Sequence, residues 1–349
     1  MTTYTFETMT QTQADAFVTG DVLLFSSTTT SGRSVAVTLT APSPVAVSKL
    51  SFAVGGKSLT FAQNAFVDDT SIIMTDSSTL VVNAADGVNT AGSNGDDQIY
   101  GGLGNSTDGA DTITGGNGND ILQGNNGADT LLGGNGNDIL AGDTGDDLLN
   151  GGDGNDVIYG GYGNDTIDGG DGNDVLIGDH GADSLSGGAG DDWFLGGGIG
   201  VGGDADTLTG GAGNDNFLTC PGNSGVFTAG KVAPGTADII TDFNGGTRGS
   251  GVHGGTGDTL EFYRLGEGTL ANYAEQTATS YAVAESQANG LFTGNLALKY
   301  VVVQVASDSW AFASFTPGSG ADTVIFLQGV ALTGISHENF DDIWLPVPS

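Results

Sequence analysis

The sequence has few of the side chains from which most catalytic and redox sites are built. Among its 349 residues there is one cysteine, Cys220, and there are three histidines, His180, His253 and His337. A single cysteine excludes an internal disulfide, and three scattered histidines exclude a Cys/His metal cluster. The chain has no HExxH zinc motif and no GxSxG nucleophile elbow with a triad, so we predict that the protein is not an enzyme.

Cationic side chains and long apolar runs are equally scarce. Lys and Arg together number 7 against 42 Asp and Glu, the formal net charge is −35, and no Lys or Arg lies between Lys57 and Lys231. Nucleic acid and anionic membrane surfaces are therefore poor partners for such a chain without calcium bridges, and we expect no nucleic-acid partner. No apolar run reaches the length of a membrane-spanning helix, so we predict no transmembrane segment.

What is abundant is a nine-residue pattern, Gly-Gly-x-Gly-Asn/Asp-Asp-x-apolar-x, which is repeated thirteen times between Gly92 and Leu218. Clean copies run from Gly151 to Tyr159 and from Gly169 to Ile177. The eighth position is apolar in every unit, from Ile99 to Phe217. A disordered Gly/Asp-rich linker would not need an apolar residue at this strict spacing, so we favour a folded repeat.

The sixth position of the pattern is aspartate in every unit. These residues are Asp97, Asp111, Asp120, Asp129, Asp138, Asp147, Asp156, Asp165, Asp174, Asp183, Asp192, Asp206 and Asp215. Three glycines in six residues allow positive φ angles and let backbone carbonyls turn toward one point. Carboxylate and carbonyl oxygens in such a loop suit Ca²⁺, which accepts six to eight oxygen ligands.

The pattern resembles the RTX nonapeptide repeat of calcium-binding β-roll proteins. This resemblance implies that ions lie between the loops of neighbouring units on the same edge, held by the sixth-position aspartates and by loop carbonyls. Seven odd and six even units would leave six and five such gaps, so we predict Ca²⁺ as the cofactor, with a ceiling of about eleven ions. The last three residues of each unit should form a short strand, and two units should close one coil of eighteen residues.

Such a coil has a thin core. Two apolar side chains per coil stabilise less than the ordering of eighteen residues costs, so we expect calcium binding and folding to be one event. The fold class that we predict is therefore all-β: a parallel β-roll, or calcium solenoid, of about thirteen units over residues 92–218. It should be flanked by a small β-rich domain in residues 1–91 and by a mostly β cap with one helix in residues 219–349.

The flanking regions contain several expected elements. The predicted elements are strands at Asp21–Phe25, Ser34–Leu39, Val45–Val54 and Thr79–Val82, a helix from Leu270 to Asn289 ended by Gly290, and a hairpin of Tyr300–Ala306 and Trp310–Ser314. The segments Ala237–Phe243 and Gly257–Phe262 resemble those that follow RTX repeats in serralysin-type proteins. The segments Ala321–Val330 and Phe340–Trp344 resemble the C-terminal secretion region of that family.

Odd and even units differ on the outside of the roll. The seventh position of odd units reads Ile121, Ile139, Val157, Val175 and Trp193, whereas even units carry mostly Thr and Ser there. Both five-residue insertions, near Asn105–Ala110 and Gly198–Gly202, fall in even units. We expect the apolar stripe to be a contact surface, covered either by another copy of the chain or by the chain's own flanking domains.

These observations lead to a functional hypothesis. The N-terminal residues lack the basic and apolar regions of a Sec signal peptide, and the C-terminal segments resemble a type I secretion region. We therefore expect an extracellular or cell-surface protein of a Gram-negative bacterium, exported by a type I system. The cap also resembles those of RTX-type S-layer proteins, which favours a calcium-dependent structural protein that self-assembles into a surface layer or filament. The alternative is a calcium-dependent adhesin that binds cell-surface polysaccharide.

Overall fold

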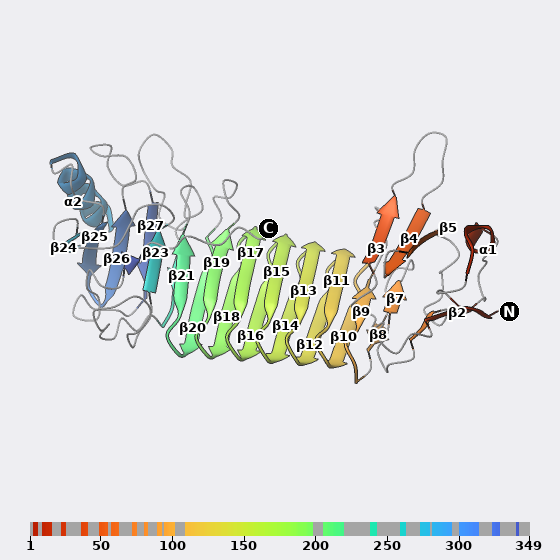
Figure 1. The fold of residues 1–349 in the computed structure, drawn as a ribbon. Coiled ribbons are helices and arrows are strands. Elements are labelled where there is room, and N and C mark those ends of the chain that lie inside the picture. The colour runs from red at the N-terminus through yellow and green to blue at the C-terminus, as the bar shows by residue number, and fades with distance from the viewer. Residues whose placement is uncertain are drawn as a thin grey trace. The chain divides into compact units, whose positions relative to one another are not determined.

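The computed structural model forms two compact units, residues 1–158 and 159–349, and each is described by itself. The described residues are 3–5, 9–15, 22–25, 36–40, 49–54, 57–62, 72–74, 80–82, 89–92, 94–101, 109–197, 205–219, 238–242, 259–262, 273–279, 281–294, 300–313, 323–328 and 340–341. Both units contain part of a parallel β-solenoid, as predicted, in which strands from alternate repeats build two facing sheets (Figure 1).

In the first unit the strands of even repeats form one sheet and those of odd repeats form the other. The even sheet contains β8 (Asn89–Ala91), β10 (Thr112–Asn117), β12 (Thr130–Asn135) and β14 (Leu148–Asp153). The odd sheet contains β7 (Leu80–Val82), β9 (Gln98–Tyr100), β11 (Ile121–Asn126) and β13 (Ile139–Thr144). All pairs are parallel, and Ile121 lies opposite Ile139, eighteen residues later. The eighteen-residue coil is therefore confirmed.

The N-terminal region adds two small sheets and a short helix. These are a parallel sheet of β1 (Thr3–Thr5), β2 (Val22–Phe25) and β6 (Ile72–Met74), an antiparallel sheet of β3 (Ala36–Thr40), β4 (Lys49–Val54) and β5 (Lys57–Ala62), and α1 (Gln11–Asp15). The four strands predicted here are confirmed as β2, β3, β4 and β7. Because β7 and β8 pair with β9 and β10, strands from before Gly92 extend both sheets of the roll. The predicted domain boundaries stay predictions.

The second unit continues with the same alternation after β15 (Val157–Tyr162), which spans the border between the units. Its even strands are β16 (Thr166–Asp171), β18 (Ser184–Ala189) and β20 (Thr207–Ala212), and its odd strands are β17 (Val175–His180), β19 (Trp193–Gly197) and β21 (Asn216–Thr219). The cap extends both sheets: β22 (Asp238–Ile240) and then β27 (Thr323–Leu327) follow β20, while β23 (Thr259–Phe262) and then β28 (Phe340–Asp341) follow β21.

The predicted cap helix is wrong in both of its bounds. Residues Tyr273–Ala278 form β24, a strand paired in parallel with β25 (Tyr300–Val305), and the helix α2 runs from Tyr281 to Gly294. Pairing with β25 therefore overrides the local helical pattern at its start. Gly290 does not end the helix, which continues to Gly294, and a Cβ at Gly290 would meet only open space. The predicted hairpin is confirmed as β25 paired antiparallel with β26 (Asp308–Ala313).

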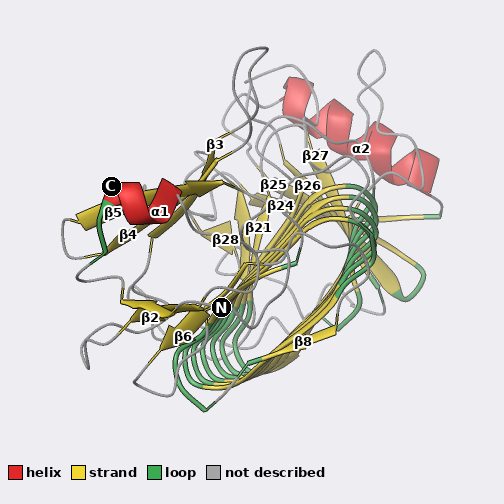
Figure 2. Ribbon diagram, turned by 90° about the vertical axis from the view of Figure 1, so that its right-hand side faces the viewer, coloured by secondary structure: helices red, strands yellow, loops and turns green. Residues whose placement is uncertain are grey.

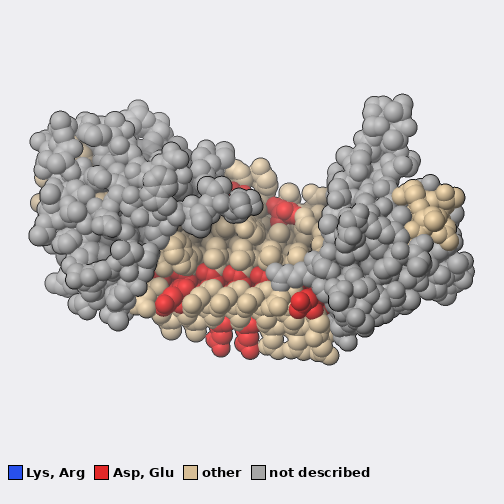
Figure 3. All heavy atoms as spheres, in the orientation of Figure 1, with Lys and Arg blue, Asp and Glu red and all other residues tan. Residues whose placement is uncertain are grey.

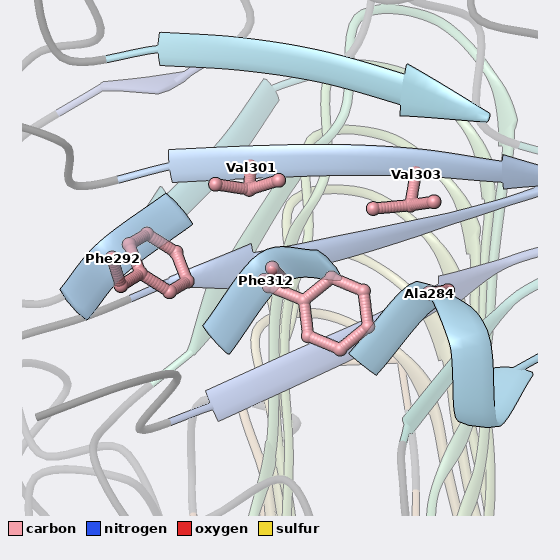
Figure 4. Close-up of a cluster of buried hydrophobic side chains, with 6 residues drawn as sticks. Ala284, Phe292, Val301, Val303 and Phe312 are labelled. Atoms are coloured by element: carbon pink, nitrogen blue, oxygen red, sulfur yellow. The ribbon is translucent and has the colours of Figure 1, made fainter. Parts of the chain in front are cut away.

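The cap has a hydrophobic core of its own. Ala284, Ala288 and Phe292 recur at four-residue spacing on one face of α2, as expected for a helix that packs on a sheet. They contact Val301, Val303 and Phe312 of β25 and β26 (Figure 4). Figure 4 shows these side chains between the helix and the strands, so the cap is held by ordinary apolar packing.

The strands of the roll are longer than the three residues that we predicted. Most contain six residues, because the first three residues of the next repeat continue the strand, and Gly116 pairs in register with Gly134. The eighth-position side chains form the core between the sheets, each at most 4% exposed. Near the cap, Phe194 and Phe217 stack with ring centroids 4.8 Å apart. The first two glycines of a repeat therefore continue the strand, because the repeated backbone pairing outweighs the low strand propensity of glycine.

Close packing of the coils explains the fourth-position glycines. Gly145 has a φ of 144°, and a Cβ added there would lie 1.5 Å from the Gly127 carbonyl oxygen of the preceding coil. No side chain fits without separating the coils.

We expect Gly145→Ala to destabilise the calcium-loaded roll by about 2 kcal/mol or more, because the strain and the clash with backbone add together. The matched control is Gly290→Ala, which meets nothing within 4 Å in the middle of α2 and should be neutral or stabilising by up to about 1 kcal/mol. Chemical denaturation in calcium measures both, and equal stabilities of the two variants would contradict the assigned packing.

Candidate calcium loops

The candidate site is a repeated loop in which a buried aspartate stands at each edge of each coil. Figure 2 shows the loops in green, stacked along the edges of the strands. All thirteen sixth-position aspartates, from Asp97 to Asp215, are at most 3% exposed. Each precedes a buried eighth-position residue, so the same strand start positions a carboxylate and a core side chain. The sequence pattern singled out the carboxylates that the structure buries; their predicted role as metal ligands stays a prediction.

One oxygen of most of these carboxylates accepts a hydrogen bond from a backbone amide of the preceding coil. The Asp97 amide donates to Asp120 Oδ1 at 2.7 Å, and the Asp111 amide donates to Asp129 Oδ1 at 2.7 Å. In the second unit the Asp174 amide donates to Asp192 Oδ1 at 2.9 Å. These bonds orient each carboxylate along the stacking direction, between two coils.

The other oxygen faces a space lined by backbone. Within the described residues the buried Oδ2 atoms of Asp120, Asp129 and Asp192 accept no hydrogen bond. A Cβ built on Gly115 would lie 2.2 Å from Asp120 Oδ2 and 2.7 Å from the Gly133 carbonyl oxygen. Carboxylate and carbonyl oxygens thus converge beside a first-position glycine, and the same arrangement recurs at Gly124 and Gly187. Hard oxygens that converge in this way fit Ca²⁺, whose positive charge would satisfy them.

Without a bound cation, burial disfavours the ionised form of these carboxylates. The pKa of Asp120 is raised to about 7, chiefly by desolvation; the hydrogen bond from the Asp97 amide opposes this rise, and the charges of Asp138 and Asp97 add to it. Desolvation likewise raises the pKa of Asp129 and of Asp192 to about 6. A bound divalent cation would reverse this effect by favouring the ionised forms.

Backbone carbonyls must complete any ion site. Within the described part of the chain no three His, Cys, Asp or Glu side chains come together as a metal-binding group. His180 stacks on Tyr162 with ring centroids 4.3 Å apart. Cys220, His253 and His337 lie outside the described residues. The predicted ligand set, sixth-position aspartates with loop carbonyls, therefore stays a prediction.

Fifth-position residues stabilise the loops in a way that we did not predict. The amides of Asn137 and Asn155 donate to the side-chain oxygens of Asn119 and Asn137, one coil earlier, each at 2.8 Å. The Asn/Asp alternation at this position was visible in the sequence. Both residue types carry the side-chain oxygen that this ladder needs.

The two edges of the roll differ in backbone chemistry. On the even edge Asn125, Asp143 and Asp179 replace the second glycine and adopt left-handed φ angles of 75°, 71° and 73°, which Asn and Asp tolerate best among residues with side chains. The insertions lengthen the coil to 23 residues, since Asp97 bonds Asp120 and Asp183 bonds Asp206. The insertions were therefore located correctly, although parts of them lie outside the described residues.

The outward surfaces differ as well. Ile121, Ile139, Val157, Val175 and Trp193 are half-buried, and Val175 pairs in register with Trp193. The large apolar side chains that are exposed are Leu132, Leu148, Tyr159 and Tyr162, and Tyr159 follows Val157 on the outward face of β15. Figure 3 shows Asp and Glu along the described face and no Lys or Arg on it.

Comparison with known proteins agrees with this geometry. A family model described as RTX calcium-binding nonapeptide repeat (4 copies) matches residues 91–107, 106–140, 141–176, 168–198 and 201–219. Repeats of this family bind calcium and are typical of secreted proteins, and serralysin-type proteases also carry them. No curated protein matches it. Within the described residues no helix is long and apolar enough to cross a membrane.

The raised pKa values predict opposite effects of pH on calcium binding and on the metal-free fold. Protons compete with Ca²⁺ for Asp120, Asp129 and Asp192, so calcium affinity should fall as the pH is lowered from 8 to 6. Without calcium the native roll binds more protons than the unfolded chain between about pH 4 and pH 7, so acid should stabilise it and rising pH should destabilise it. Calcium titration and circular dichroism in chelator measure the two effects.

A pair of variants distinguishes the effect of a buried carboxylate on calcium affinity from the effect of net charge. Asp120→Asn keeps Oδ1 but replaces Oδ2 by an amide group, so calcium affinity should fall about tenfold or more at the adjoining sites. Asp171→Asn removes the same charge from an exposed position at the end of β16 and should change calcium affinity less than about twofold. Calcium affinity that is independent of pH, or equal losses in the two variants, would contradict the assignment.

Proposed function

We propose that this chain, which is an RTX β-roll protein, is a secreted structural protein that folds on calcium and then self-assembles into a surface layer or filament. The observation that carries the proposal is the row of buried carboxylates with raised pKa values, Asp120, Asp129 and Asp192 among them, in a chain of net charge −35. A fold of this kind is unfavourable at neutral pH without calcium. Free calcium of roughly 10⁻⁴–10⁻³ M, the range of extracellular modules, would complete it.

Self-assembly is supported by the odd-sheet face. Its seventh-position residues, Ile121 and Ile139 among them, repeat in register along the coils. A row of apolar side chains with the period of the coil suits a repeated contact between copies. A head-to-tail contact that does not close into a ring grows into a filament or a sheet.

Ile139→Lys combined with Val157→Lys should abolish polymers that form on adding calcium, because each lysine places a charge in the contact. Calcium binding should change little, since these half-buried side chains point away from the core side of the strand. Thr112→Lys combined with Thr130→Lys puts the same charges on the even sheet of the same unit and should assemble normally. Electron microscopy of the calcium-loaded proteins gives the result, and normal polymers of the Ile139/Val157 variant would remove this face from the assembly.

The alternative function is that of an adhesin that binds cell-surface polysaccharide. It is favoured by two exposed tyrosines on β15, Tyr159 and Tyr162, which are 44% and 59% exposed. Exposed tyrosine presents an apolar ring and a polar hydroxyl, which suits a sugar surface. A calcium-loaded monomer that is retained on a polysaccharide column, and is released by Tyr162→Ala, would favour this function over assembly.

Export through a type I system, as an unfolded chain, is part of the same proposal. Low calcium inside the cell would keep the carboxylates apart until the chain reaches the outside. Deletion of residues 321–349 should retain the protein inside the producing cell, as measured by immunoblotting of cells and medium. Undiminished secretion of the truncated chain would refute this route.

A further inference from the structure

The last odd-edge loop of the roll, Gly210–Asp215, meets the cap instead of another nonapeptide repeat. Strand β22 pairs with β20 so that Thr207 lies opposite Ile239 and Leu208 opposite Ile240. The same register places Thr241 beside Thr209, and their hydroxyls are 2.7 Å apart. One step further it places Asp242 beside Gly210. Aspartate thus stands at the position that a first-position glycine occupies inside the roll.

The Asp242 carboxylate binds this last loop through two backbone amides. Gly210 N–H donates to Asp242 Oδ1 and Gly211 N–H donates to Asp242 Oδ2, both at 2.8 Å. At the start of the roll the equivalent amide of Gly92 donates instead to a backbone carbonyl of the next coil, that of Thr114, at 2.6 Å. A side chain has therefore taken over the acceptor role that the following coil plays elsewhere.

A side chain at this position also prevents another loop of the same geometry. Inside the roll a Cβ on Gly187 would lie 2.2 Å from Asp192 Oδ2 and 2.7 Å from the Gly210 carbonyl oxygen. It would fill the space in which these calcium-ligand candidates converge. Asp242 carries such a Cβ, so the stack of equivalent loops ends there for a steric reason as well as through hydrogen bonding.

We propose that Asp242 terminates the calcium roll: its carboxylate closes the last odd-edge loop through the protein itself, with no calcium ion beyond it. The connection is reinforced by the Thr241 amide, which donates to the Leu208 carbonyl at 2.9 Å, and by the Gln328 amide, which donates to the Ile240 carbonyl at 2.9 Å. Asp242 is thus a positioning residue that joins an ion-dependent stack to an apolar cap. The inference rests on the calcium-dependent folding proposed above.

Amide hydrogen exchange of the full-length chain tests the assignment. With saturating calcium, Asp242→Ala should speed exchange at Gly210 and Gly211 at least about tenfold, because both amides lose a charged acceptor. The loop at Gly133–Asp138 and the cap strand β25 should exchange as in the wild type. Asp242→Asn, which keeps the shape and one acceptor oxygen, should show a smaller increase. Asp171→Asn, which removes one exposed carboxylate at the end of β16, should leave the exchange rates of the Gly210 and Gly211 amides unchanged.

Two results would overturn the proposal. One is wild-type exchange at Gly210 and Gly211 in both Asp242 variants. The other is faster exchange in β25 of those variants, because Asp242 would then act in the fold of the cap instead of at the end of the roll. The wild type in chelator tests the proposed function separately. If the amides of Gly133–Asp138 stay fully protected from exchange there, the proposal of calcium-dependent folding is wrong. The comparison of the Asp242 variants in calcium is a separate measurement and does not depend on that result.

Discussion

The buried carboxylate between successive coils is the constraint on which the rest of this structure depends. One oxygen of Asp120 is fixed by the amide of Asp97, and the other lies buried beside the Gly133 carbonyl. Burial of carboxylate oxygens without a compensating positive charge opposes folding. The raised pKa of Asp120 has the same cause, because burial disfavours its ionised form. The two facing sheets cannot supply that compensation, because their core is one apolar side chain per repeat. A bound divalent cation can, and so the metal and the fold are linked.

Glycine is the second part of the same constraint. Successive coils approach so closely that a Cβ at Gly145 would lie 1.5 Å from a backbone oxygen, and one at Gly187 would lie 2.7 Å from the Gly210 carbonyl oxygen. The space that glycine leaves is where carboxylate and carbonyl oxygens meet. The repeated pattern therefore records two requirements at once, a close backbone approach and a set of converging oxygens. Substitution of a glycine by alanine tests the first, whereas substitution of an aspartate by asparagine tests the second.

The cap is stabilised by different physics. Val301, Val303 and Phe312 are fully buried against the apolar face of α2, so this part of the chain does not need ions to bury its core. The cap nevertheless continues both sheets of the second unit through β22 and β23. Asp242 stands where the two kinds of stabilisation meet. The aspartates of the roll are calcium-ligand candidates, whereas Asp242 serves as a hydrogen-bond acceptor for backbone amides.

The sequence by itself determined the repeated part of the protein: the burial of all thirteen aspartates, the apolar core, the eighteen-residue register and its lengthening at both insertions. It could do so because every important contact in the roll joins a residue to its equivalent one coil later, and a strict period encodes such contacts. Only the tertiary structure decided the features without a period. The strand Tyr273–Ala278 was taken for the start of a helix because its partner, β25, lies more than twenty residues on. The role of Asp242 depends on amides some thirty residues before it, and a local pattern cannot specify contacts between such distant, unrelated segments.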